Sequence, residues 1–319
     1  MTVQILGDLI ADLGMRLSDF PVRAEDIHRL SYMDMGPGGA CNVAIMAARF
    51  GLQVGCIGEV GDDGFGQLVR AGLEREGVGT AHLQVTPGAR TPVAGVIVDH
   101  SGEPAYLGYR GNLHIRHWPA AWDTPVKQAE ALFADGWAEN RDVPAMVLQG
   151  FRLARTAGVP VYFDPGPGNP EVDSAWIQEA VALSRVLLLN RSEAISLVGD
   201  LKDTRLVSTL LAMGPEWVVL KRGSEGLILA HGKEQIDAPG FSVEVKDTTG
   251  AGDSVTGAIM YGILKGLALE KLAVLAAATG AAKVMKLGTG HNLPTLAEIA
   301  SVLKSNGMEA AEYLPAIER

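Results

Sequence analysis

The stretch Asp247-Thr248-Thr249-Gly250-Ala251-Gly252-Asp253 decides how this chain is interpreted. Two glycines introduce the largely apolar segment 251–264, for which we predict a helix. The N–H groups at a helix start have no partner inside the helix, and the helix dipole favours negative charge there, so this turn can bind an anion. A carboxylate in the same turn, Asp253, can take the proton of an attacking hydroxyl group, as phosphoryl transfer to an alcohol requires. The alternative is a glycine-rich turn in which Asp253 only caps the helix.

Length and charge narrow the classes of protein that this chain can represent. Its 319 residues predict one large α/β domain with an appendage, or two domains. The 27 Lys and Arg against 37 Asp and Glu give a net charge of −10, which argues against nucleic acid or an anionic membrane as a main partner. No signal peptide is evident and no apolar run approaches the ~18 residues of a membrane span, so a cytoplasmic protein is expected. Cys41 and Cys56 show no metal-ligand spacing.

Strand-like and helix-like segments alternate along most of the chain. Short apolar runs predict strands at residues 3–6, 54–58, 131–133, 160–163, 186–189, 217–220 and 227–230. Segments of helical character lie between and after them, notably at 40–50, 65–76, 251–264, 269–286 and 295–305. This alternation indicates a parallel sheet covered by helices. Residues 243–245 alternate like one more strand, leading into the glycine-rich turn.

Two segments depart from this pattern. Residues 93–98 and 104–109 flank a turn-forming pentapeptide, 99–103, and so predict a hairpin. A hairpin is not expected inside a parallel sheet, and we therefore assign it, with the irregular segment 12–35, to a small antiparallel flap. The predicted division is a large domain of residues 1–11, 36–90 and 111–319, and a small β lid of residues 12–35 and 91–110.

Four motifs, in chain order, resemble those of the ribokinase-like, or PfkB, carbohydrate kinase family. Residues 38–44 resemble its Gly-Gly-x-x-x-Asn-x-Ala signature, with two residues in place of three between Gly39 and Asn42. Residues 190–193 resemble its Asn-x-x-Glu motif, 221–226 its Lys-x-Gly-x-x-Gly nucleotide loop, and 247–253 its second signature, without a gap. The motifs span nearly the whole chain. The resemblance implies a three-layer αβα domain with a mainly parallel central sheet, a small β-sheet lid over the site, and ATP-dependent phosphorylation of a hydroxyl group on a sugar or sugar acid.

The resemblance also implies roles for individual residues. Asp253 would be the catalytic base, and Gly250, Ala251 and Gly252 would supply the amides that bind the γ-phosphate. Further ATP-binding positions are Asn190, Lys221, Gly223, Gly226 and Thr248.

Two positions are implied as cation sites. Glu193 would organise Mg²⁺ through water, since Mg²⁺ prefers hard oxygen ligands and retains waters. The alternative is that Asn190 caps the turn 191–194 and Glu193 is a solvated carboxylate at the helix start. Some family members bind K⁺ beside the anion site through an aspartate and carbonyl groups; Asp247 stands at that position, with Thr249 and Gly288 nearby, and the sequence permits this K⁺ site without requiring it.

The substrate side is implied by a second set of residues. Asp12, with Asp8 as the weaker alternative, matches an aspartate that binds sugar hydroxyls, and carboxylates accept such hydrogen bonds well. Other positions implied as substrate-binding are Gly38, Gly39, Asn42, Arg110 and Asp164. Arg110 is equally compatible with a solvated surface position. The segment after Asp164 departs from the pattern of fructokinase-like members, which weakens an assignment as a fructokinase.

Several functions stay open. A nucleoside kinase of the same family would use aromatic residues of the flap, for which Tyr32, Tyr106 and Tyr109 are candidates. A non-catalytic sugar sensor on this fold would not need the intact turn 250–253. A dinucleotide-dependent oxidoreductase is disfavoured, since residues 7–12 lack the Gly-x-Gly-x-x-Gly fingerprint. An exposed flap edge predicts a homodimer through the lid.

Overall fold

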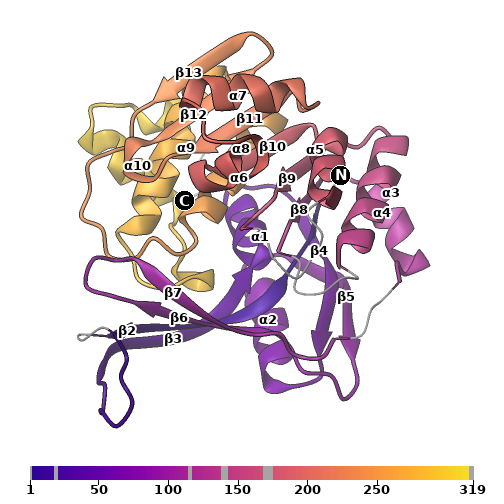
Figure 1. Cartoon of the computed structure of the whole chain (residues 1–319), viewed down its shortest axis with the longest axis vertical. Coiled ribbons are helices and arrows are strands. Elements are labelled where there is room, and N and C mark those ends of the chain that lie inside the picture. Colours follow the sequence, from indigo (N-terminus) through magenta and orange to yellow (C-terminus); the bar gives the residue numbers. More distant parts are fainter. Residues whose placement is uncertain (1, 18–20, 114–116, 138–142, 168–174, 316–319) are drawn as a thin grey trace.

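The structure is a computed structural model that describes residues 2–17, 21–113, 117–137, 143–167 and 175–315 (Figure 1). Its centre is a nine-stranded sheet in the order β13-β12-β11-β10-β9-β8-β1-β4-β5. The strands are β1 (Val3–Leu6), β4 (Val54–Gly61), β5 (Gly79–Thr86), β8 (Ala131–Asp135), β9 (Val161–Asp164), β10 (Val186–Asn190), β11 (Trp217–Lys221), β12 (Leu227–His231) and β13 (Glu234–Ala238). From β5 to β11 the strands pair in parallel, and β12 and β13 continue the sheet antiparallel.

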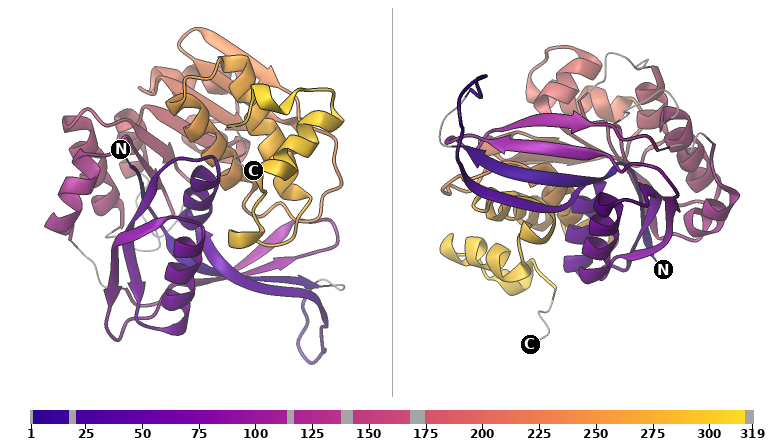
Figure 2. Two further views of the ribbon diagram at one scale, coloured as in Figure 1. Left: turned by 180° about the vertical axis from the view of Figure 1, so that it is seen from behind. Right: turned by 90° about the horizontal axis from the view of Figure 1, so that it is seen from below.

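Helices cover both faces of this sheet, giving three layers (Figures 1 and 2). One face carries α1 (Ala40–Arg49), α2 (Gly64–Arg75), α8 (Ala251–Leu264), α9 (Leu269–Val284) and α10 (Leu296–Ser305). The other carries α3 (Asp123–Lys127), α4 (Val143–Thr156), α5 (Ala175–Leu183), α6 (Arg191–Val198) and α7 (Asp203–Ala212). The predicted α/β fold with a mainly parallel sheet is confirmed.

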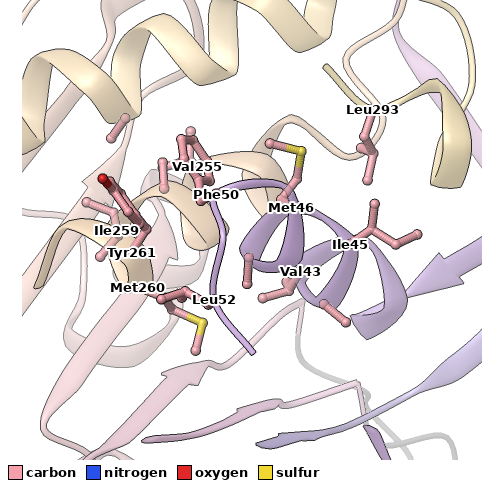
Figure 3. Close-up of a cluster of buried hydrophobic side chains, with 14 of the residues drawn as sticks. Val43, Ile45, Met46, Phe50, Leu52, Val255, Ile259, Met260, Tyr261 and Leu293 are labelled. Atoms are coloured by element: carbon pink, nitrogen blue, oxygen red, sulfur yellow. The ribbon is translucent and has the colours of Figure 1, made fainter. Parts of the chain in front are cut away.

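Alternate residues of the buried strands feed two separate cores. On β10, Val186 and Leu188 face one layer of helices, whereas Leu187 and Leu189 face the other. In the first core α1 packs on α8, as Figure 3 shows. There Phe50 stacks on Tyr261 with ring centroids 5.2 Å apart. This packing fixes the start of α8 relative to α1, and both helix starts contribute to the site described below.

A second, four-stranded sheet extends from this body, in the order β3-β2-β6-β7 (Figure 2). Its strands are β2 (Leu9–Leu17), β3 (Leu30–Gly39), β6 (Val93–Val98) and β7 (Pro104–Tyr109). The expectation of a wholly antiparallel flap is wrong, because β2 and β6 pair in parallel. The reason is the connection: β3, α1, β4, α2 and β5 intervene between β2 and β6, and so long a crossover allows parallel pairing. The division into a large domain and a lid stays a prediction.

Two local expectations fail for physical reasons. Residues 243–245 form no strand; they run irregularly past the end of α9, where the Lys246 and Asp247 N–H groups bind the Val284 carbonyl. Of these residues only Val243 packs against the core, whereas Glu244 and Val245 are exposed, so the alternating sequence does not correspond to one buried face. Conversely, the partly exposed strands β5 and β13 lie at the sheet's two edges and carry too few buried residues to show in the sequence. Within the described residues, no helix has the length and apolar character needed to cross a membrane.

Candidate active site

A cavity of about 310 Å³ opens at the carboxyl edge of the main sheet. Four neighbouring strands, β8 to β11, each end on a polar residue that lines it: Asp135, Asp164, Asn190 and Lys221, respectively. Parallel strands end at the same edge of a sheet, and ligands of open α/β folds bind outside these ends. The second sheet contributes to the same cavity through Asp12, Tyr106 and Tyr109. The topology therefore brings residues from most of the chain to one place.

The start of α8 forms one end of the cavity. Gly250 is the N-cap residue, with a left-handed φ of 74° that favours glycine, and both Gly250 and Gly252 line the cavity. Asp253 lies within the first turn and is not the N-cap, so the helix-capping alternative for this residue is wrong. Its Oδ2 accepts a hydrogen bond of 3.0 Å from Asn42 Nδ2 of α1. Burial raises the pKa of Asp253 to about 6, against the opposing effects of Asn42 and Lys221.

Asp12 is held by a hydrogen bond from Thr289 and by close packing against Gly38. Its Oδ2 accepts a 2.7 Å hydrogen bond from Thr289 Oγ1, and burial, with the nearby carboxylate of Asp253, raises its pKa to about 7. A Cβ atom added to Gly38 would lie 2.0 Å from the Asp12 carboxyl carbon, so only glycine leaves room for this carboxylate. Gly38 itself is not among the residues that line the cavity.

The start of α1 approaches the same point. Gly39 lines the cavity with a φ of 57°, and a Cβ atom there would lie 2.2 Å from the Asp8 carbonyl oxygen. Asn42 follows in the first turn of α1, where its Oδ1 accepts from the Gly290 N–H at 3.0 Å. Both polar atoms of the Asn42 amide are thus used, one by Gly290 and the other by Asp253. These two hydrogen bonds explain why an asparagine lies buried in an Ala-rich helix.

Lys221 and Asp164 form an ion pair of 2.6 Å inside the cavity, each with 14% of its side chain exposed. Burial opposes the charged form of Lys221, yet the carboxylates of Asp164 and Glu193 raise its pKa above the usual value. Its Nζ lies 3.3 Å from the position that a Cβ atom of Gly252 would take. A fixed positive charge therefore stands directly beside the anion-binding turn.

Asn190 and Glu193 make a capping box at the start of α6. Asn190 Oδ1 accepts from the Glu193 N–H at 2.9 Å, and Glu193 Oε2 accepts from the Asn190 N–H at 2.7 Å. The capping alternative is thus present in the structure, yet both residues also line the cavity. Burial and the charge of Asp164 raise the pKa of Glu193 to about 7. An added cation would relieve this crowding of carboxylates.

The donors here fit Mg²⁺ held largely through water and phosphate. No group of three His, Cys, Asp or Glu side chains within the described ranges is arranged to hold a metal by itself. Mg²⁺ keeps several waters and is commonly bound through one or two carboxylates together with substrate phosphates. Glu193 and Asp164 offer such carboxylates at the cavity wall.

The structure does not bring every predicted residue to the cavity. Arg110 and Thr248 line it, and the Thr248 N–H donates at 3.0 Å to the Gly102 carbonyl in the β6–β7 turn. Ala251 begins α8 beside the lining residues. Gly223 and Gly226, in contrast, lie in the turn between β11 and β12, outside the lining residues.

Three further polar residues were not found from the sequence. Asp135 is buried at the end of β8, where burial and the charge of Asp8 raise its pKa well above the usual value. Thr289 binds Asp12, as described above. Lys283 of α9 is fully buried, and its Nζ donates to the carbonyl oxygens of Asp247 at 3.2 Å and Lys286 at 3.1 Å. An acid at the end of a buried strand was an available signal for Asp135; no sequence signal marked the other two.

Comparison with known proteins places this geometry among kinases of small hydroxyl compounds. The model of the pfkB family of carbohydrate kinases matches residues 2–296. The chain is 25% identical to the ribokinase of Bacillus subtilis over 300 residues, covering 94% of this chain and 98% of that protein. It is 28% identical to 5-dehydro-2-deoxygluconokinase 1 of Bacillus cereus, covering 87% and 86%. A solved structure of Arabidopsis thaliana ribokinase, complexed with ribose and ATP, superposes with a TM-score of 0.79 at 23% identity, covering 95% of this chain and 98% of that one.

Proposed function

Since the chain belongs to the pfkB family of carbohydrate kinases, we propose that it transfers the γ-phosphoryl group of ATP to a hydroxyl group of a sugar or sugar acid, with Asp253 as the base. The observation that carries this proposal is the position of Asp253. Its carboxylate lies in the first turn of α8, beside Gly250 and Gly252, and lines a cavity at the carboxyl edge of the sheet.

Asp253 is suited to general-base catalysis. A base works best when its pKa lies near the working pH, and burial brings the pKa of Asp253 to about 6. At neutral pH the group is therefore mostly ionised, yet more basic than an exposed aspartate. Asn42 Nδ2 donates to one carboxylate oxygen, which orients the group and leaves the other oxygen to accept the proton of the substrate hydroxyl.

The transferred phosphoryl group would lie against the backbone amides of residues 250–252. N–H groups at a helix start have no partner within the helix and can donate to phosphoryl oxygens as charge develops. The Ala251 N–H also donates to the Thr248 carbonyl at 3.2 Å and would be shared between the two acceptors. The Lys221 ammonium stands beside Gly252 and would neutralise part of that charge. Glu193 would hold Mg²⁺ through water, and the ion would supply further positive charge to the phosphate groups.

The acceptor would bind on the Asp12 side of the cavity. Asp8, Asp12 and Asp135 line the cavity and supply carboxyl groups that suit hydroxyl-rich molecules. Arg110 is the side chain there that suits the carboxylate of a sugar acid, because its planar fork can bind both oxygens. The acceptor proposed is therefore a polyhydroxy compound, and the contribution of Arg110 distinguishes a neutral sugar from an acid.

A second candidate, a nucleoside kinase, is favoured by one observation. Four aromatic residues line the cavity, Tyr106, Tyr109, Phe133 and Trp137, and aromatic faces stack on nucleobases. Of the candidates expected from the sequence, Tyr106 and Tyr109 are among them. Tyr32 is not: its hydroxyl accepts from Asn292 Nδ2 outside the cavity.

The test is the release of ADP from MgATP with and without a panel of acceptors: ribose, fructose, 2-keto-3-deoxygluconate, inositol-type compounds and nucleosides. The proposal predicts acceptor-dependent ADP release for at least one sugar or sugar acid. Release with nucleosides alone would support the second candidate. Tight sugar binding without any ADP release would instead identify a sensor on this fold and overturn the proposal.

Two expectations accompany this proposal and stay predictions. The exposed edges of the second sheet suit a homodimer through that sheet. A cytoplasmic location is expected for a kinase that uses ATP. Neither the mechanism nor the choice of acceptor depends on them.

A further inference from the structure

The feature that the proposed reaction does not use is a buried positive charge behind the anion-binding turn. Lys283 is 0% exposed and is the only lysine or arginine among the buried residues that the structure describes. Burying an ammonium group is costly unless it is paired and hydrogen-bonded. Burial lowers the pKa of Lys283 to about 8, so that the group is still mostly protonated at neutral pH. A lysine retained at this position therefore has to find oxygen partners.

The oxygen atoms around Lys283 Nζ are those of a small cation site. The Asp247 carbonyl lies at 3.2 Å, the Lys286 carbonyl at 3.1 Å and the Asp247 Oδ2 at 4.0 Å. Both oxygens of the Asp247 carboxylate also accept hydrogen bonds from the backbone. Asp247 Oδ1 accepts from the Thr249 N–H at 2.8 Å, and Oδ2 accepts from the Gly288 N–H at 2.7 Å. One ammonium thus holds together the two segments that contain residues 247–249 and 286–288.

Both segments continue into the site. Residues 247–249 lead directly to Gly250, the N-cap of α8. Residues 286–288 lead to Thr289 and Gly290, which donate to Asp12 and Asn42, respectively. A displacement of either segment would therefore move the anion-binding amides, or the side chains that position the acceptor and the base.

A K⁺ ion at Asp247, which the sequence permits, does not fit this arrangement. The ammonium already donates to the Asp247 carbonyl and faces the Asp247 carboxylate, the oxygens that such an ion would require. A second monovalent cation among the same oxygens would meet a like charge at short range in a buried place. The Lys283 ammonium group itself supplies the positive charge at this position.

We propose that the ammonium group of Lys283 is a built-in monovalent cation that positions the anion-binding turn, so that this kinase works without K⁺. Lys283 is a positioning residue here, because it touches neither the reacting oxygens nor the acceptor. The proposal rests on the proposed kinase function, and its test therefore includes a measurement that needs no turnover.

The first experiment compares wild-type activity in KCl with activity in tetramethylammonium chloride at equal ionic strength. Wild-type rates should agree within about twofold, since the cation is tethered. Activation of the wild type by K⁺ of tenfold or more would overturn the proposal. This arm remains decisive even if no variant of Lys283 folds.

Two variants of Lys283 separate its charge from its bulk. Lys283→Met keeps much of the volume without the charge, and Lys283→Ala leaves a space among the same oxygens. Without K⁺, both should lose activity by ~100-fold, the effect of losing one anion-hole donor. KCl should restore Lys283→Ala at least ~10-fold and leave Lys283→Met inactive. Lys271→Ala is the matched control, since Lys271 lies on the same helix, is 44% exposed and pairs with Glu312.

Thermal unfolding supplies the measurement that is independent of activity. A ligand that binds only the folded state raises Tm, so KCl in place of tetramethylammonium chloride should raise the Tm of Lys283→Ala by about 2–5 °C and leave the wild type unchanged. A folded Lys283→Ala that gains neither activity nor Tm from K⁺ would contradict the proposal. If no acceptor is phosphorylated by the wild type, the proposed function fails, and the Tm comparison still decides whether Lys283 replaces a cation.

Discussion

Gly38→Ala tests the acceptor side of the site through one added methyl group. In the structure, a Cβ atom at residue 38 would lie 2.0 Å from both Cγ and Oδ1 of Asp12 and 2.3 Å from Oδ2. Ordinary contacts are about 3.5–4.0 Å, so the carboxylate has to withdraw by more than ~1 Å. It would then lose its 2.7 Å hydrogen bond from Thr289 and its place at the cavity wall.

The expected loss follows from the hydrogen bonds that Asp12 would make to the acceptor. A hydrogen bond to a charged group contributes about 1.5–3 kcal/mol. Two such bonds to neighbouring hydroxyls, weakened but not wholly lost when the carboxylate moves, correspond to a loss of roughly 3–4 kcal/mol. At 1.4 kcal/mol per factor of ten, kcat/KM for the acceptor should fall by ~10²–10³-fold. The KM for ATP should stay within about threefold of the wild type, because residues 250–252 are untouched.

The assay is ADP release at saturating MgATP over a range of acceptor concentrations, with circular dichroism to confirm folding. Gly36→Ala is the matched control: it lies on the same strand, and its Cβ atom would meet nothing closer than 3.6 Å. It should retain kcat/KM within about threefold. A folded Gly38→Ala protein whose acceptor kcat/KM is within threefold of the wild type would refute the assignment of Asp12.

The remaining predictions concern buried carboxylates and their partners. kcat/KM should decrease as the pH is lowered through an apparent pKa between about 6 and 7, because burial raises the pKa of Asp253 to about 6 and that of Asp12 to about 7, and both residues act in the ionised form. A flat profile of kcat/KM from pH 5 to 8 would contradict this. Asn42→Ala should lower kcat by ~10–100-fold through loss of the donor to Asp253, with Asn306→Ala, at the end of α10, as control. Asp12 binds its proton more tightly folded than unfolded, so the wild type should lose stability as pH rises from about 4 to about 7. Asp12→Asn should therefore raise the free energy of unfolding in urea by about 1–3 kcal/mol at pH 8 and by much less at pH 4; an equal change at both would refute the burial argument.

The sequence predicted the buried parts of this fold best. Strands such as β10 are continuous apolar runs because both faces are covered, and such runs are visible without a structure. The edge strands β5 and β13 were missed because few of their residues are buried. Residues 243–245 were wrongly predicted as a strand because their apolar-polar-apolar pattern does not match their burial: Val243 packs against the core, whereas Val245 is exposed.

The candidate site likewise contains residues that the sequence predicted and residues that it did not. Motif positions such as Asp253 and Asn42 were expected because they match signatures of the family, and Asn42 is in addition a costly residue inside an Ala-rich helix. Thr289 and Lys283 were not, because their role arises from contacts with Asp12 and Asp247, which lie 277 and 36 positions away in the chain. A threonine in a loop and a lysine in an Ala-rich helix carry no local sign of such partners. Only the three-dimensional arrangement connects them to the site.

The central claim is that Asp253 accepts the proton of the acceptor hydroxyl, and the turnover number of Asp253→Asn tests it most directly. Asparagine keeps the shape of the side chain and cannot act as the base, so kcat should fall by at least ~10²–10⁴-fold while the protein stays folded and binds ATP. Asp200→Asn, at an exposed position, is the control that should keep its kcat. A folded Asp253→Asn enzyme with kcat within tenfold of the wild type would contradict the account.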